Sequence, residues 1–225
     1  DKKTGWDRMS KDELAAMQDY AEGYKSFLNE AKTERDDVAF LKAKAESLGY
    51  QPYTRGCPIT PGQKYYKVNR NKAIILTVVG KQPLSSGINL TAAHLDAPRI
   101  DIRTVPLYED NGMAFFKTHY YGGIKKYQWV TLPLALYGVV IKKDGSIIDI
   151  NIGDNDGDPV LGISDLLPHL GAKQMAKKAS EFIPGENLNI LVGSKPLKDT
   201  EKDAVKAGIL SILKEKYDIE EDDLI

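Results

Sequence analysis

Apolar side chains recur at helical spacing through the first fifty residues of the chain. Ser10 and Glu13 form a capping box, in which the serine oxygen and the glutamate carboxylate each accept an unpaired backbone N–H. Behind this box lies a stripe made of Leu14, Met17, Ala21, Tyr24 and Leu28. A second start signal, Thr33 to Asp36, precedes a stripe made of Val38, Leu41, Ala45 and Leu48. The pattern predicts two helices, each with one buried face, and Gly49 ends the second.

The pattern then changes from helical to strand-like. The segments Lys64–Val68 and Ala73–Val79 flank the turn-like Asn69-Arg70-Asn71 and predict a β-hairpin. The segment Ile88–His94 predicts a third strand, which is apolar enough to lie in the middle of a sheet. Helices followed by buried strands predict a mixed α/β layer.

From Pro98 onward, short apolar segments alternate with turn residues such as Asp110-Asn111-Gly112. The predicted strands are Ile100–Arg103, Ala114–Tyr120, Ala135–Ile141, Ser146–Ile152 and Asn189–Val192. A helix is predicted over Asp203–Tyr217, and its inward positions are Val205, Ile209, Ile212 and Leu213. We interpret this region as a β-rich module inserted after the third strand.

Composition excludes several classes of partner. The 225 residues carry a formal net charge of −1, so the chain lacks the basic surplus that non-specific nucleic-acid binding requires. The single cysteine, Cys57, has no internal disulfide partner, and we therefore expect a reducing, cytoplasmic location. The amino terminus lacks the apolar run of a signal peptide. The longest weakly polar run, Trp129–Ile141, is too short to span a bilayer, so we expect no membrane segment.

One short motif points to chemistry. His94 and Asp96 stand two residues apart at the end of the predicted third strand, so their side chains should point to the same side of the sheet. Pro98 should end the strand near its carboxyl edge, where α/β sheets place ligands. An imidazole at that edge can bind Zn²⁺ while the carboxylate orients a neighbouring ligand or base. The alternative is a histidine that caps a strand and an aspartate that starts a turn.

A run of five residues suggests a second metal site. Asp154-Asn155-Asp156-Gly157-Asp158 resembles a calcium-binding loop. However, Pro159 occupies the sixth position, where an EF-hand turn requires glycine. We therefore expect a solvated turn and no calcium site.

Four separated segments resemble the aspartyl aminopeptidase family, or aminopeptidase I family, of zinc metallopeptidases. They are Ala92–Pro98, Tyr120–Trp129, Asp158–Leu161 and Leu167–Leu170, in the family's order and approximate spacing. Members of this family hold two zinc ions in an α/β peptidase domain that a β-rich dimerisation domain interrupts. The resemblance implies an α/β fold in which residues 1–97 are the amino-terminal part of the peptidase domain, with helices on a mixed sheet. Residues 98–225 would be the dimerisation domain and a return segment.

The resemblance also implies roles for three residues. His94 would ligate one zinc ion, and Asp96 would support the metal site. His169 would reach from the dimerisation domain into the active site of a neighbouring subunit. There it could donate a hydrogen bond to the developing oxyanion, the role we favour, or serve as a metal ligand. Without the resemblance, His169 would be interpreted as a helix-end residue beside Pro168.

Two departures from the family pattern limit what this chain can do. A two-zinc site needs a bridging carboxylate, further ligands and a glutamate base, which lie downstream in the family. Residues 172–225 contain no histidine, so we expect a fragment that is inactive by itself. Val130-Thr131-Leu132 stands where many relatives have an Asp-Arg pair, and this difference concerns substrate preference.

Two functions follow from these observations. The first is a cytoplasmic metallo-aminopeptidase that removes amino-terminal residues from peptides and forms a homo-oligomer, a dimer or a larger closed assembly. Its two-zinc site would be completed by residues absent from this chain. The second is a non-catalytic self-association module, in which His94 would be structural.

Overall fold

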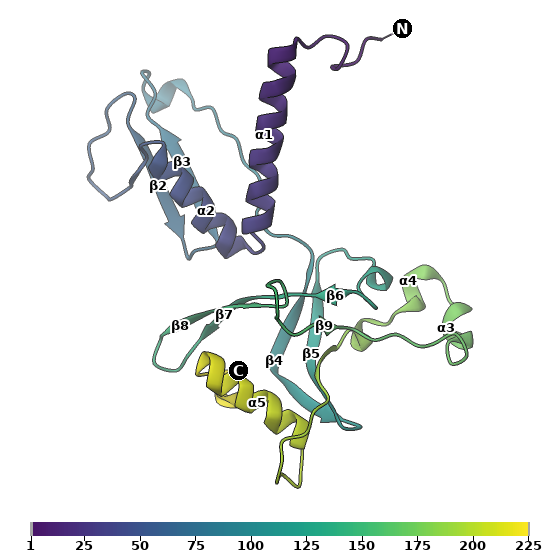
Figure 1. Ribbon diagram of the computed structural model, residues 1–225. Coiled ribbons are helices and arrows are strands. Elements are labelled where there is room, and N and C mark those ends of the chain that lie inside the picture. Colours follow the sequence, from purple (N-terminus) through teal and green to yellow (C-terminus); the bar gives the residue numbers. More distant parts are fainter. Residues whose placement is uncertain (1, 225) are drawn as a thin grey trace. The chain divides into compact units, whose positions relative to one another are not determined.

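The computed structural model describes residues 2–224 and divides the chain into two units, the first ending at Ala97 and the second beginning at Pro98. Each unit combines helices with β-sheet, so the predicted mixed α/β fold is confirmed (Figure 1). The assignment of the two units to a peptidase domain and a dimerisation domain stays a prediction.

The first unit contains two helices and a three-stranded sheet. The helices are α1 (Lys11–Glu30) and α2 (Glu34–Ser47). The strands are β1 (Gln51–Pro52), β2 (Lys64–Asn69) and β3 (Ala73–Val78), and a 3₁₀ turn, η1, follows at Leu84–Ser86. The sheet order is β1-β2-β3, with β1 parallel and β3 antiparallel to β2. Both predicted helices and the predicted hairpin are confirmed, whereas the sequence pattern did not predict β1.

Local signals explain why these elements begin and end where they do. Ser10 and Glu13 form the predicted capping box, with Ser10 N donating to Glu13 Oε2 at 2.8 Å. Thr33 forms the equivalent box at the start of α2. Gly49 has a φ of +83°, the left-handed conformation that ends helices and that glycine adopts without strain.

The core of the first unit lies between α2 and β2. Val38 and Ala45 of α2 are buried, as are Tyr65 and Tyr66 of β2. The Tyr66 hydroxyl donates to Glu46 Oε1 at 2.6 Å and so joins the helix to the sheet. This side-chain bond connects residues that are twenty positions apart in the sequence.

Two expectations about the first unit are wrong. The stripe on α1 is not buried: α1 contacts α2 through the rings of Phe27 and Phe40, and Tyr24 and Leu28 stay 54% and 47% exposed. The predicted third strand is also absent, and Ile88–His94 has no regular structure. A strand needs a neighbour that takes its backbone N–H and C=O groups, and within residues 2–224 no strand pairs with this segment.

The second unit is built on a five-stranded antiparallel sheet of order β4-β5-β10-β9-β6. Its strands are β4 (Arg99–Asp110), β5 (Met113–Tyr121), β6 (Pro133–Leu134), β9 (Leu161–Gly162) and β10 (Ile190–Gly193). A separate hairpin consists of β7 (Leu136–Ile141) and β8 (Ile147–Ile152). The helices are α3 (Ala172–Met175), α4 (Ala179–Phe182) and α5 (Ala204–Tyr217). Short 3₁₀ turns are η2 (Lys126–Gln128), η3 (Gly185–Asn187) and η4 (Glu221–Asp223).

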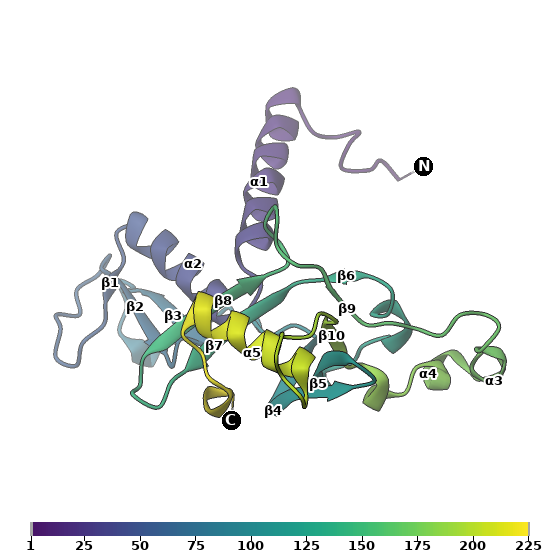
Figure 2. The same cartoon turned by 60° about the horizontal axis from the view of Figure 1, so that its bottom comes forward.

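The helix α5 packs on this sheet and closes the core of the second unit (Figure 2). The buried cluster includes Leu107, Phe116, Leu161, Ile163, Leu188, Ile190 and Val205. Ile209 and Leu213 of α5 pack against it as predicted, but Ile212 is 49% exposed, so its predicted inward position is wrong. The packed positions of α5 also include Leu210, and at 100° per residue Ile212 falls just outside the packed stripe, on the side away from Leu210.

One strand of the second unit is longer and less regular than predicted. β4 continues to Asp110, with a shift in register between Ile102 and Leu107. Within this bulge Val105 has a φ of +46°, and its N–H donates to the carbonyl oxygen of Leu224 at 2.7 Å. The bulge thus joins β4 to the last described residue of the chain. No helix among residues 2–224 has the length and apolar character that crossing a membrane requires.

Candidate functional site

His94 and Asp96 lie in an irregular segment that brings them together without a strand. Nδ1 of His94 is 2.8 Å from the backbone oxygen of Asp96 and 3.5 Å from its carboxylate Oδ1. The imidazole is 83% exposed and the carboxylate 44% exposed. The two residues therefore lie close together, but in a segment without regular structure and not through the alternation of a strand.

This contact leaves the other ring nitrogen of His94 without a proton, as binding to a metal ion requires. A histidine ligand commonly donates one ring N–H to a carbonyl or carboxylate, which fixes the tautomer and leaves the second nitrogen to bind the ion. The backbone oxygen of Asp96 fills that role for Nδ1, so Nε2 is the nitrogen available for zinc. His94 thus fits as one ligand. Among residues 2–224, however, no group of three or more His, Cys, Asp or Glu side chains could hold a metal ion.

A cluster of contacts lies at the start of the second unit. Pro98 packs against Gly122, where a β-carbon added to the glycine would lie 3.4 Å from Cβ of the proline. Arg99 Nε donates to Asp101 Oδ1 at 2.7 Å, and the guanidinium lies 4.4 Å from the centre of the Tyr121 ring. The sequence pattern did not predict this cluster, although the double glycine after Tyr121 marks a place where the backbone turns.

His169 belongs to the second unit and lies in the turn between β9 and α3. Figures 1 and 2 both show the chain from β9 to α3 extending away from the five-stranded sheet. The turn is closed by Asp165, whose Oδ1 accepts from Gln174 Nε2 and from the backbone N–H of Leu166, both at 2.8 Å. Three exposed leucines, Leu166, Leu167 and Leu170, surround the histidine in the sequence. An exposed imidazole on an apolar, closed turn is suited to contact another polypeptide chain.

The acidic segment after β8 forms the expected turn. Asp158 Oδ2 accepts from the backbone N–H of Gly153 at 2.9 Å and from that of Asn155 at 3.1 Å. These hydrogen bonds stabilise the carboxylate and hold the pKa of Asp158 below its usual value. Because its own turn already occupies this carboxylate, the segment is not arranged as a cation site.

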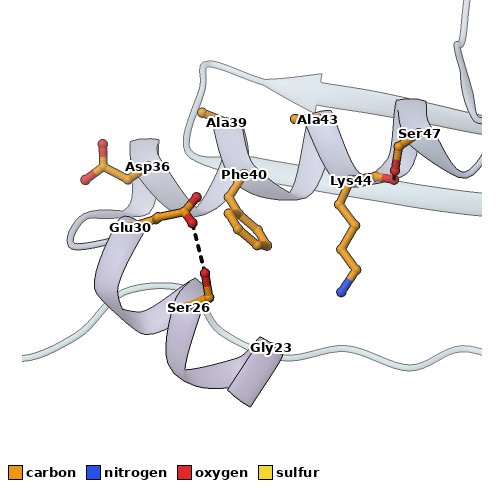
Figure 3. Close-up of a pocket in the computed structure, with 9 residues that line it drawn as sticks. All are labelled: Gly23, Ser26, Glu30, Asp36, Ala39, Phe40, Ala43, Lys44 and Ser47. Atoms are coloured by element: carbon orange, nitrogen blue, oxygen red, sulfur yellow. Dashed lines mark hydrogen bonds between the residues drawn. The ribbon is translucent and has the colours of Figure 1, made fainter. Parts of the chain in front are cut away.

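An open hollow lies between α1 and α2 in the first unit (Figure 3). Phe40 and Lys44 project into it from α2. Its carboxylates are already engaged, because Ser26 Oγ donates to Glu30 Oε1 at 3.0 Å and Thr33 N donates to Asp36 Oδ2 at 2.9 Å. The hollow offers no convergent set of reactive groups.

Comparison with known proteins assigns the family. A family model described as aminopeptidase I zinc metalloprotease (M18) matches residues 27–225. The chain therefore belongs to this family of zinc metallopeptidases, as the motifs predicted. A protein of Clostridium acetobutylicum named "Probable M18 family aminopeptidase 1" is 48% identical, and the match covers 99% of this chain and 49% of that protein.

Solved structures give the same result. The crystal structure of an M18 family aminopeptidase from Thermotoga maritima has a TM-score of 0.90 and 44% identity, covering all of this chain and 48% of that one. Aminopeptidase I from Borrelia burgdorferi has a TM-score of 0.87 and 38% identity, covering 99% of this chain and 50% of that one. The chain thus spans about half the length of the relatives it matches, consistent with a fragment of a metallo-aminopeptidase.

Proposed function

We propose that the complete polypeptide is a zinc aminopeptidase and that this chain supplies one metal ligand and one residue that acts on a neighbouring subunit. The observation that carries the proposal is the contact between His94 and Asp96, which orients the imidazole for an ion. The family match supports zinc as that ion. The 225 residues by themselves are expected to be inactive, because three convergent ligands are lacking among the described residues.

The residues of this chain would have distinct roles at the metal site. His94 would bind zinc through Nε2, and Asp96 would hold the imidazole through its backbone oxygen while its carboxylate orients the rest of the site. When bound, zinc supplies Lewis-acid polarisation of the scissile carbonyl and lowers the pKa of water. The family's two-ion stoichiometry, carried over from the resemblance, would require the further ligands of the complete polypeptide.

His169 would act in trans as a hydrogen-bond donor to the oxyanion of the peptide substrate. Support comes from its position on an exposed turn flanked by Leu167 and Leu170, which are 64% and 72% exposed. Burial of these leucines against a second copy would stabilise a homo-oligomer. A cytoplasmic location is part of the same proposal and accords with the single cysteine.

The three histidines of this chain allow a matched test in the complete polypeptide. His94→Ala should abolish binding of one zinc ion and lower kcat/KM by at least about a hundredfold, since the ligand itself is lost. His119→Ala, on the exposed end of β5, is the control and should leave both unchanged. Zinc content by mass spectrometry and hydrolysis of a chromogenic amino-acid amide give the two readouts. If the wild-type polypeptide binds no zinc, the self-association alternative replaces the enzyme.

A mixing experiment separates the two roles proposed for His169. His169→Ala should keep its zinc but lose about a hundredfold in kcat, comparable to removal of one oxyanion donor. Mixed oligomers of His94→Ala and His169→Ala subunits should regain activity. In such an oligomer, the active site of a His169→Ala subunit keeps its own His94 and receives an intact His169 from a neighbouring His94→Ala subunit. Loss of zinc in His169→Ala would instead identify a metal ligand, and no recovery on mixing would contradict action in trans.

A further inference from the structure

The turn that carries His169 is shielded from solvent only at polar positions and at a glycine. Within residues 164–178 the residues that are not exposed are Asp165, Gly171 and Gln174. The large apolar side chains of the same segment are all more than half exposed: Leu166, Leu167, Leu170 and Met175. Residues 164–178 therefore have no apolar core of their own, and the conformation of the turn depends on its hydrogen bonds.

One carboxylate oxygen joins the two ends of this turn. Asp165 Oδ1 accepts from the backbone N–H of Leu166 and from Gln174 Nε2, both at 2.8 Å. Asp165 precedes the turn, whereas Gln174 follows it in α3. Hydrogen bonds to a carboxylate are stronger than those between neutral groups. A cross-link between the ends of a loop removes conformational freedom from every residue between them, which here include His169.

The backbone on both sides of His169 packs against the same glutamine. A β-carbon added to Gly171 would lie 3.3 Å from the carbonyl oxygen of Leu167 and 3.5 Å from Gln174 Oε1. Two backbone hydrogen bonds enclose the histidine, from Leu170 N to the oxygen of Leu167 at 2.9 Å and from Gly171 N to the oxygen of Pro168 at 3.2 Å. The amide of Gln174 thus binds Asp165 through its nitrogen and lies close to Gly171 through its oxygen.

We propose that Asp165 and Gln174 are positioning residues, which hold His169 in the conformation in which it acts on a neighbouring subunit. A donor to an oxyanion must lie within hydrogen-bond distance of it, and a misplacement of about 1 Å can cost about a hundredfold in rate. Fixing the turn before it meets its partner also lowers the entropy lost on docking. The proposal rests on the proposed role of His169 and identifies the residues that make that role possible.

Substitutions in the complete polypeptide test the cross-link directly. Asp165→Ala should lower kcat by about tenfold and leave KM within about threefold, because it disturbs the placement of a transition-state donor and not substrate binding. Asp165→Asn retains an acceptor oxygen and should keep most of the wild-type kcat. Gln174→Ala removes the other partner and should cost as much as Asp165→Ala. The double variant should be no worse than either single variant, since both break one interaction.

Another turn of the second unit supplies a matched control. Asp144 Oδ1 accepts from the backbone N–H of Ser146 at 2.9 Å and from its Oγ at 2.6 Å, so this aspartate also closes a turn. Asp144→Ala should leave kcat unchanged, because its turn carries no histidine. Thermal unfolding and light scattering would compare the stability and the oligomeric state of all variants. Equal losses of kcat in Asp144→Ala and Asp165→Ala would overturn the proposal.

A combination with His169→Ala shows whether Asp165 acts through the histidine. Adding Asp165→Ala to His169→Ala should cause no further loss of kcat, because the group that the aspartate positions is already gone. A further loss would mean that Asp165 acts elsewhere. If Asp165→Ala does not fold, Gln174→Ala takes its place in the same comparison.

The single variants separate this proposal from the one on which it rests. A wild-type kcat in His169→Ala would contradict the role of the histidine itself. A loss of kcat in His169→Ala, with unaffected Asp165→Ala and Gln174→Ala variants, would contradict the positioning role alone.

Discussion

The two units of the chain differ in what their apolar side chains contact. In the second unit, residues from β4, β5, β9, β10, α5 and their connections form one buried cluster, and Leu188 and Ala114 are completely buried. In the first unit the buried positions lie between α2 and β2, while Leu90 and Ile88 are 80% and 68% exposed. What differs is how many neighbours the described residues of each unit supply to its apolar side chains.

The largest expected effect is on autonomous folding. Residues 98–225 produced alone should unfold in one cooperative transition, because the sheet and α5 bury a shared core. Residues 1–97 alone should show helical signal without such a transition, because few buried side chains offset the entropy of ordering the chain. Circular dichroism during thermal and urea unfolding provides the measurement. A sharp transition in the shorter fragment would remove the contrast between the units.

The sequence predicted the elements whose signals are local. The capping box at Ser10, the second box at Thr33 and the hairpin after Lys64 were all predictable, because each depends on neighbouring residues. The strand expected at Ile88–His94 was not formed, because a strand depends on neighbours that the local pattern does not specify. The same reason explains the exposed stripe of α1.

Only part of the candidate site was predictable from the sequence. The side chains of His94 and Asp96 lie close together, but in a segment without regular structure and not by the predicted alternation of a strand. The contact of Gly122 with Pro98 could not have been predicted, because the β4–β5 pairing brings these two residues together. A motif specifies residue types, whereas the register of a hairpin decides which of them meet.

The next effect compares one substitution at two sites. Leu188→Ala in the second unit should lower the free energy of unfolding by about 2–5 kcal/mol, because the side chain is fully buried and its removal leaves a cavity. Leu90→Ala in the first unit should change it by less than about 0.5 kcal/mol, since that side chain is 80% exposed in this chain. Urea titration of both variants tests the difference. A large loss in Leu90→Ala would mean that the segment is covered in solution.

A smaller effect concerns how helices begin in the two units. α5 lacks a capping side chain of its own, and Glu109 of β4 instead accepts from the backbone N–H of Val205 at 2.9 Å and of Lys206 at 3.0 Å. Glu109→Ala should cost about 1–2 kcal/mol of global stability, because it leaves these N–H groups unpaired at a helix amino terminus.

Ser10→Ala is the counterpart in the first unit. It removes a cap from α1, a helix with no buried residue, so it should weaken that helix locally and leave the global transition nearly unchanged. Amide hydrogen exchange along α1 measures the local loss, and urea unfolding measures the global one. Equal global costs for Ser10→Ala and Glu109→Ala would contradict the view that only α5 is coupled to a core.

The smallest effect concerns charge. Asp218 follows α5 and accepts from Lys142 Nζ, in the β7–β8 turn, and from Lys214 Nζ, each at 2.6 Å. These two hydrogen bonds lower the pKa of Asp218 to about 2. A lowered pKa in the folded state means that the stabilisation is present above the unfolded value near 3.8 and is lost as the pH falls through about 2.

Asp218→Asn should therefore be less stable than the wild type at pH 5, and the difference should shrink steadily between pH 4 and pH 2, within the window that the pKa of about 2 defines. Urea unfolding across that range, at low salt, measures this difference in stability, and 1 M salt should reduce the difference by screening.

The control is Glu22→Gln, which breaks the ion pair between Glu22 and Lys25 within a single turn of α1. That pair joins no separate segments, so its loss should not affect the global transition. A pH-independent difference for Asp218→Asn would show that the aspartate acts through shape and not through its charge.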